Sequence, residues 1–405
     1  MNTRPADAGW LTGALIVLTG LIAALIVAAV VIRVIRVLRD RRRDRLAAAP
    51  RRALLAFVAE GGEEGAEDLL AISPRAWRAT EPAAVALLGK VRGDAHGALA
   101  EVFEQRGAAR QALAQLHHPD AVRRARAAET LGYLGRADAA EPIHALLDDK
   151  DPEVRVVAAR ALGAIGAPAS AAPLLAALDR HRMPAHLVAF ALSRIGAGAV
   201  PDLQTALSDD APTVRATALN ALGLIGAIGS VSAIIDLLDR EPHPDVRLAA
   251  VTTLGLLGGR SAVAPLRAAL DPARASGLRA AAARSLGEVG GPDAATVLGD
   301  LLADPDYHVA NEAARALRRL GPPGRRRLQE IADDASPAPA AEPDGASPAP
   351  AAEPGAGCSV LSPGVPPGIA GVTAAAHARQ ALALLDLEEN TGRRSPAPST
   401  THPGP

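Results

Sequence analysis

The chain contains little cysteine, lysine or aromatic residue. Among its 405 residues are one cysteine, two tryptophans, two tyrosines and three phenylalanines, and Lys90 and Lys150 are the only lysines among 43 basic residues. A single thiol, Cys358, excludes an intramolecular disulfide and is in keeping with a reducing compartment. Few aromatic side chains and a net charge of −1 do not supply the basic face and stacking platforms typical of nucleic-acid binders. We therefore predict no nucleic-acid partner.

The sequence also lacks the spacings that catalysis and metal binding require. It has no Gly-x-Gly-x-x-Gly, no phosphate loop, no Gly-x-Ser-x-Gly, no Cys-x-x-Cys and no His-Glu-x-x-His. His117 and His118 precede Asp120, but they fall between two apolar helical patterns with no third ligand nearby, which favours a polar turn. We predict no catalytic residue, no metal site, no cofactor and no small-molecule substrate, and hence a protein that is not an enzyme.

One long apolar run is present near the start of the chain. Residues 10–32 carry no charge, and at ~1.5 Å per residue a helix of this length measures about 34 Å, enough to cross a hydrocarbon core of ~30 Å. The run is too long for a cleaved signal peptide, and its charges lie on the wrong side. Residues 33–52 hold nine arginines against two aspartates, which places the N-terminus outside and the rest in the cytoplasm. The sequence predicts a single-pass protein of the inner membrane, with anionic lipid headgroups against Arg33–Arg52.

A small pattern recurs eight times through the middle of the chain. Its clearest copy runs from Asp151-Pro152-Glu153-Val154-Arg155 through two alanines and a Leu-Gly pair to Gly166. The closing glycine recurs every 28 to 32 residues, at Gly107, Gly135, Gly166, Gly196, Gly226, Gly258, Gly290 and Gly321. Within one copy the apolar residues follow helical spacing, the aspartate can cap the helix and the glycine can end it. Each copy therefore predicts a pair of antiparallel helices, and no segment predicts a strand.

The Val-Arg, Ala-Ala and Leu-Gly-x-Ile-Gly elements resemble HEAT repeats, in particular the short HEAT-like repeats named after the phycobilisome lyases. The resemblance implies an all-α solenoid in which the Val-Arg helix lines the concave wall. It also implies a structural ladder in which each arginine bonds an acidic residue of its own or the adjacent loop. The ladder position holds Arg124, Arg155, Arg215, Arg247 and Arg279, and it is interrupted at Ala185 and Ala310.

Composition and pattern divide the chain into six segments. These are a short extracytoplasmic N-terminus at 1–9, a transmembrane helix at 10–32, a basic juxtamembrane segment at 33–52, a helical neck at 53–94 that caps the array, the repeats at 95–331, and a disordered Pro/Ala-rich tail at 332–405 with one helix near 373–389. The terminal helix either covers the last repeat or serves as a short docking motif, and the sequence leaves both open.

A partner surface is predicted from the positions nine, six and two residues before each closing glycine, which should face the concave groove. The apolar centre of this surface is expected at Leu187, Phe190, Leu224 and Leu256, inside a polar rim of Tyr133, Arg160, Arg194 and Asn220. The repeat that contains Phe190 departs most from the pattern, because Pro184 and Ala185 replace Val-Arg. The alternative is that Leu187 and Phe190 only fill a wider gap between helices.

These features together favour a membrane-anchored scaffold that binds a protein partner, with an envelope polysaccharide glycosyltransferase as the candidate partner. A bilin-lyase-like or other enzyme-accessory subunit is the alternative, and a third hypothesis is a regulator whose terminal helix fills its own groove. The identity of the partner, its pathway and the oligomeric state do not follow from the sequence.

Overall fold

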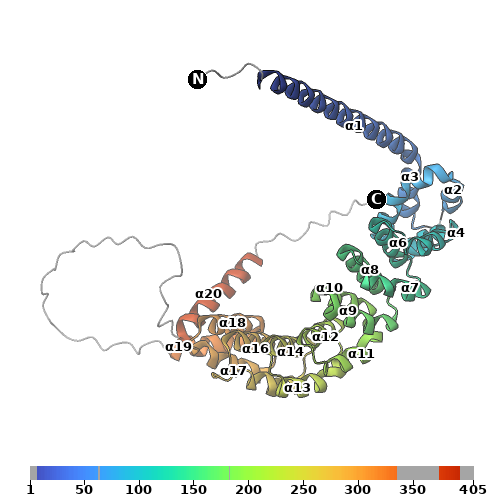
Figure 1. The fold of residues 1–405 in the computed structure, drawn as a ribbon. Helices are drawn as coiled ribbons and strands as arrows, with labels where there is room; N and C mark the ends of the chain where they lie inside the picture. The colour runs from blue at the N-terminus through green and yellow to red at the C-terminus, as the bar shows by residue number, and fades with distance from the viewer. Residues whose placement is uncertain (1–6, 63, 182, 335–373, 393–405) are drawn as a thin grey trace, which may run out of the picture. The chain divides into compact units, whose positions relative to one another are not determined.

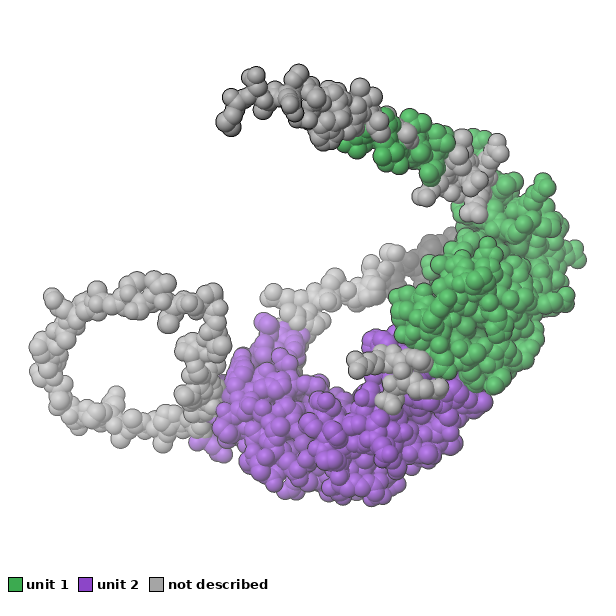
Figure 2. All heavy atoms as spheres, viewed as in Figure 1, with its two compact units in different colours: residues 1–165 green, residues 166–405 purple. Residues whose placement is uncertain are grey.

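A computed structural model describes residues 7–62, 64–181, 183–334 and 374–392 of the chain. Every regular element within these ranges is a helix, which confirms the predicted all-α fold. The chain forms two compact units, residues 1–165 and residues 166–405 (Figure 2), and each unit is described by itself.

Unit 1 holds the neck and the first repeats. Its helices, coloured blue to green in Figure 1, are α1 (Asp7–Ala59), α2 (Ala66–Ala71), α3 (Pro74–Leu88), α4 (Asp94–Gln105), α5 (Ala108–Gln115), α6 (Ala121–Leu134), the 3₁₀ turn η1 (Ala137–Ala139), α7 (Ala140–His144), η2 (Ala145–Asp148) and α8 (Pro152–Ile165).

Helix α1 contains the apolar run 10–32 and continues through the arginine-rich residues 33–52. Among the residues that the structure describes, no helix is both long and apolar enough to cross a membrane. The predicted transmembrane helix and the localisation in the inner membrane are therefore wrong. The contact of Arg33–Arg52 with lipid headgroups stays a prediction, although the transmembrane helix on which it depended is not supported. Residues 1–6, part of the predicted extracytoplasmic N-terminus, lie outside the described residues.

The core of the neck is organised around Trp77. Trp77 is buried, and its ring lies edge-on to Phe103 at 5.3 Å. The guanidinium of Arg106 lies 4.2 Å from the Trp77 ring centroid and donates hydrogen bonds to the carbonyls of Leu69 at 2.7 Å and Ile72 at 2.7 Å. One arginine thus satisfies the free carbonyls at the end of α2 and stacks on the aromatic core.

Unit 2 continues the array with helix pairs. Its elements are η3 (Pro168–Ser170), α9 (Ala171–His181), α10 (Ala185–Ile195), η4 (Gly196–Ala199), α11 (Val200–Ala206), α12 (Pro212–Ile225), η5 (Ile228–Ser230), α13 (Val231–Arg240), α14 (Pro244–Leu257), η6 (Arg260–Ala262), α15 (Val263–Ala268), α16 (Ser276–Val289), α17 (Pro292–Asp300), η7 (Leu301–Ala303), α18 (Tyr307–Arg319), α19 (Pro322–Asp334) and α20 (Ala374–Gly392). In Figure 1, α12, α14, α16 and α18 form a row on the inner side of the bend of unit 2, and α11, α13 and α17 form the row beside it.

The predicted start and stop signals of the repeat are present. The Asp151 carboxylate accepts a hydrogen bond from the Glu153 amide at 2.9 Å at the start of α8. All eight closing glycines have positive φ, between 66° and 77°, a region that L side chains rarely adopt. Each copy therefore ends its first helix at the predicted residue and turns sharply into the next element.

We call the helix that ends at the closing glycine the first helix of its repeat. The first helices of neighbouring repeats approach each other most closely at the glycine of the Leu-Gly pair. A Cβ built on Gly287 lies 2.6 Å from the Cβ and 3.0 Å from the Cα of Ala316 in the next repeat, and one built on Gly132 lies 2.7 Å from the Cα of Ala161. These helices pack backbone against backbone, and a larger residue at this position forces them apart.

Helix α20 resolves the choice left open for the terminal helix. It packs on α18 and α19 at the end of the array, where its residues Ala375, Ala378 and Ala381 are buried. Arg325 bonds Asp386 at 3.0 Å, and Arg318 pairs with Glu388. The helix therefore covers the last repeat. The predicted Pro/Ala-rich stretches at 335–373 and 393–405 lie outside the described residues.

The close approach of first helices predicts different losses of stability when two glycines at the same register are replaced by alanine. We expect Gly287→Ala to lower the free energy of unfolding by about 1–3 kcal/mol, because the Ala316 backbone of the next repeat must move. We expect Gly223→Ala to change stability by less than ~1 kcal/mol, because its Cβ meets the flexible end of Leu256 at 3.2 Å and alanine favours the helix. Urea unfolding of the two full-length variants measures both, and equal losses would contradict this account of the repeat.

Candidate partner-binding surface

Buried ion pairs connect the loops of consecutive repeats. The Arg124 guanidinium donates two hydrogen bonds to the Asp149 carboxylate, at 2.6 and 2.7 Å, and one to the carbonyl of His118 at 2.8 Å. Asp149 in turn accepts from the Asp151 amide at 2.9 Å, beside the cap of the next helix. Arg124 thus ties its own loop to the loop that begins the following repeat.

The same arrangement recurs further along the array. Arg215 donates to Glu241 at 2.7 and 2.8 Å, and Arg279 contacts Asp304 at 3.1 Å. The hydrogen bonds from Arg215 lower the pKa of Glu241 below its usual value, against the opposing effect of burial. These findings support the structural ladder that the resemblance implies, because each of these guanidinium groups already has protein partners.

The ladder is incomplete where the sequence departs from the pattern. Ala185 and Ala310 provide no guanidinium, and the Arg155 side chain bonds the carbonyl of Asp149 at 2.7 Å. Arg247 holds the ladder position, but its buried Nε has no hydrogen-bond partner among the described residues. The ladder therefore contributes unevenly along the array.

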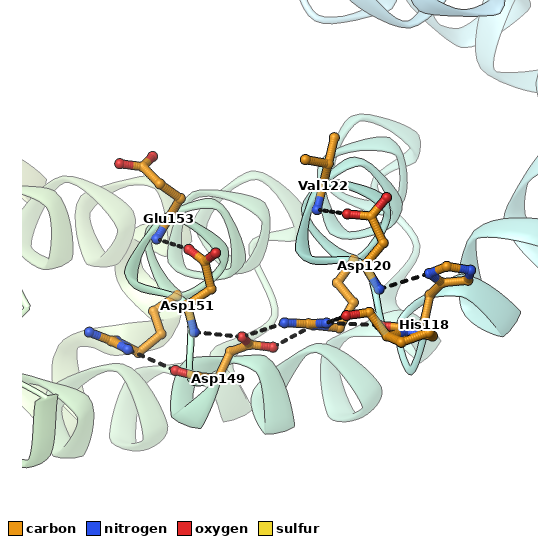
Figure 3. Close-up of polar contacts among 9 residues, drawn as sticks. His118, Asp120, Val122, Asp149, Asp151 and Glu153 are labelled. Carbon is orange, nitrogen blue, oxygen red and sulfur yellow. Dashed lines mark hydrogen bonds and ion pairs between the residues drawn. The ribbon is translucent and has the colours of Figure 1, made fainter. Parts of the chain in front are cut away.

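The histidine pair before Asp120 serves the same loop. His118 accepts a hydrogen bond from the Asp120 amide at its Nδ1, 3.0 Å away (Figure 3). Its Nε2 lies 3.2 Å from Arg123. Within the described part of the chain, no group of three or more His, Cys, Asp or Glu residues is placed to hold a metal ion. Both ring nitrogens of His118 are engaged in the turn.

Three large apolar side chains are exposed on successive first helices of unit 2. Phe190 on α10 is 55% exposed, Leu224 on α12 is 60% exposed and Leu256 on α14 is 57% exposed. Helix α12 packs against both α10 and α14. We call Phe190, Leu224 and Leu256 the apolar stripe. Leu187, one helical turn before Phe190, is partly buried.

The polar residues of the predicted rim are exposed beside the apolar stripe, but one predicted row is not on the surface. Arg194 on α10 and Asn220 on α12 are exposed. Residues nine before the closing glycine are buried from α12 onward, namely Thr217, Ala249, Ala281 and Glu312. The prediction that this row faces the groove is wrong from α12 onward, where neighbouring first helices close over it. In α6 the same row holds Arg126, which is exposed. The rows six and two before the glycine remain available.

The other two predicted rim residues lie in unit 1. Tyr133 on α6 is partly buried and donates a hydrogen bond to Glu129 at 3.2 Å, and Arg160 on α8 is exposed. Burial raises the pKa of the Tyr133 hydroxyl, and the nearby Glu129 carboxylate adds to this effect. The structure thus divides the eight predicted residues between two units, with six in unit 2. Their role in partner binding stays a prediction.

A cavity of about 540 Å³ lies beside Tyr133, between α3, α5 and α6 of unit 1. Its walls combine apolar and charged side chains, including Glu81, Val85, Lys90, Gln111, Gln115, Arg126 and Tyr133. The sequence did not reveal it, because α3 belongs to the neck, which does not follow the repeat. One signal is visible in retrospect, since Gly89 is required where the Tyr133 ring lies against α3.

The buried pair Arg215–Glu241 predicts a specific loss of stability. Arg215→Ala leaves the Glu241 carboxylate buried without its partner and should lower the free energy of unfolding by about 3 kcal/mol. Arg247→Ala removes an arginine at the same register that forms no such pair, and should cost under ~1 kcal/mol. Equal losses in urea unfolding would show that packing of the aliphatic part of the arginine side chain, and not ion pairing, determines the contribution of this position to stability.

The lowered pKa of Glu241 predicts the pH range of this effect. A carboxyl whose pKa is lower in the folded state stabilises the fold above its unfolded pKa, about 4.3, and this stabilisation is lost as pH falls through the folded value. Glu241→Gln should therefore destabilise unit 2 most near neutral pH, and the difference from wild type should shrink below about pH 4. Unfolding measured from pH 3 to 7 tests this, and a difference independent of pH would contradict it.

Comparison with known proteins supports the repeat architecture. A family model described as HEAT repeats matches residues 109–185 and 231–318. No curated protein matches the sequence significantly. Kap121p, crystallised bound to Nup53p, is 15% identical with a TM-score of 0.50; the match covers 74% of this chain and 37% of Kap121p, so this chain spans well under half of that protein.

Two smaller proteins of known structure are also similar. An engineered protein is 21% identical, with 65% of this chain and 82% of that protein covered and a TM-score of 0.33. The complex of CpcE and CpcF of phycocyanin lyase from Nostoc is 23% identical, with 55% of this chain and 92% of the matched chain covered and a TM-score of 0.29. The family model thus identifies HEAT repeats at residues 109–185 and 231–318 of this all-helical array, in agreement with the recurring pattern.

Proposed function

We propose that unit 2 is a protein-interaction scaffold that binds an apolar segment of a partner protein across α10, α12 and α14. The observation that carries this proposal is the apolar stripe, in which Phe190, Leu224 and Leu256 are each more than half exposed on adjacent helices. Arg194 and Asn220 provide polar groups beside it. An apolar centre with a polar rim is the usual plan of a protein interface.

The apolar stripe is large enough to contribute substantially to the binding of a protein partner. Burial of the area that these three side chains still expose would contribute on the order of 3–5 kcal/mol before the entropy of association is subtracted. Phe190 is the expected hot spot, since aromatic residues at the centre of an interface contribute most to binding. Kap121p shares the fold and has been crystallised with Nup53p, which supports the use of such an array for holding protein.

The scaffold is proposed to act without a reaction of its own, as the lack of catalytic motifs in the sequence predicts. The role of an accessory subunit to an enzyme, as in the bilin lyases, remains compatible with the same binding surface, and no feature of this chain favours it specifically. In the third hypothesis the terminal helix fills the groove, yet α20 packs on α18 and α19, away from the helices of the apolar stripe.

The paired substitution Phe190→Ala and Leu224→Ala tests the proposal. Both side chains are exposed, so we expect the free energy of unfolding to change by less than about 0.5 kcal/mol. A photo-crosslinking amino acid placed at Phe190 identifies the protein that contacts this helix, and binding of that purified protein is then titrated. The dissociation constant should rise at least tenfold in the paired variant, since hot-spot truncations cost about 2 kcal/mol or more.

Val122→Ala provides the matched control. Val122 is 57% exposed, like the members of the apolar stripe, but lies on α6 of unit 1. It should leave the dissociation constant unchanged. A paired variant that unfolds early yet binds the partner normally would instead favour the role of these residues as packing.

A further inference from the structure

We infer that the cavity between α3, α5 and α6 in unit 1 binds an acidic segment of a protein partner. The cavity has a volume of about 540 Å³, within the range of ligand-binding pockets, and it is formed entirely by described residues of one unit. It is a site separate from the apolar stripe, and the inference does not depend on the function proposed for unit 2.

Positive charge dominates the surroundings of the cavity. Lys90, Arg123 and Arg126 line it. Arg92 and Arg160 lie near enough to Tyr133 to act against the rise in the pKa of its hydroxyl. The Lys90 and Arg126 side chains are exposed and form no ion pair with any described residue, so both are free to meet a carboxylate.

Two carboxylates, Glu81 and Glu129, also line the cavity. Glu129 already accepts the hydrogen bond of the Tyr133 hydroxyl. Burial raises the pKa of Glu81, so its surroundings disfavour the charged form. Arg123 pairs with Asp120 at 3.9 Å, so Lys90 and Arg126, with Arg92 and Arg160 close by, are the cations that make the site basic.

The remaining groups fit a peptide. Gln111 and Gln115 stand one turn apart on α5, and their side-chain amides can both donate to and accept from a peptide backbone. Val85 and Ala112 supply an apolar wall for one side chain between two acidic ones. A nucleic acid would need an open aromatic face, but the Tyr133 ring is packed against Gly89. The geometry therefore fits an acidic peptide with an apolar residue between its carboxylates.

Fluorescence anisotropy on the full chain tests the inference with defined probes. A short labelled peptide of repeated Asp-Leu-Glu should bind, and its affinity should fall as salt screens the ion pairs. The neutral peptide of repeated Asn-Leu-Gln has nearly the same shape and should bind at least about tenfold more weakly. A chain that binds neither peptide, or that binds both equally, would overturn the inference.

Variants locate the site. Lys90→Ala with Arg126→Ala should raise the dissociation constant of the acidic peptide about tenfold or more. Arg110→Ala with Lys150→Ala makes the same change in net charge at exposed residues outside the cavity, and should change it less than about twofold. An equal loss in both pairs would show diffuse attraction and would overturn the inference.

Charge reversal and a second polymer complete the test. Lys90→Glu with Arg126→Glu should lose the acidic peptide and gain a peptide of repeated Lys-Leu-Lys, whereas loss of both would indicate a damaged fold and count against the site. Tighter binding of a poly-dT oligonucleotide than of the acidic peptide would also overturn the inference. The Phe190→Ala and Leu224→Ala variant should bind the acidic peptide normally, which separates this inference from the function proposed for unit 2.

Discussion

The close packing of successive first helices is the constraint on which the rest of this structure depends. At Gly132 and Gly287 the neighbouring helix approaches so closely that a single methyl group would meet its backbone. Each repeat covers its apolar face only with the next one, so stability is built from nearest-neighbour contacts and the two ends must be covered separately. The Trp77 core of the neck and the buried face of α20 meet that requirement at opposite ends of the chain.

The features that the sequence predicts well are those decided within one repeat or between two adjacent repeats. A closing glycine needs positive φ because of its own backbone, and the caps at Asp120 and Asp151 involve residues two positions apart. The features that escaped prediction depend on how helices lie against each other. Thr217 and Ala249 are buried by the crossing of adjacent first helices, and the cavity beside Tyr133 arises because α3 of the neck does not follow the repeat. Residues 10–32 show the same limit, since an uncharged run read alone gave a transmembrane helix that the structure does not support.

Because packing uses fixed positions of the repeat, surface chemistry can vary only at the positions left over. The rows six and two before the closing glycine are such positions, and along unit 2 they hold Phe190, Leu224 and Leu256 without any change to the core. The same rows in unit 1 hold Arg160 and Tyr133. One architecture therefore presents three exposed apolar side chains in unit 2 and polar ones at the corresponding rows of unit 1.

The arginines of this chain divide by the same argument. Arg124 and Arg215 donate their hydrogen bonds to a carboxylate and to loop carbonyls, and both partners of each ion pair are shielded from water. A guanidinium held in this way stabilises the loops and is not available to a ligand. The free energy lost by breaking a buried ion pair exceeds the free energy gained from a surface ion pair with a ligand. Lys90, Arg126 and Arg160 have the opposite character, since their charges face water without an ion-pair partner among the described residues. The number of basic residues thus says little about binding, whereas the distinction between paired and free cations separates the residues that hold the array together from those that can recognise an acidic partner.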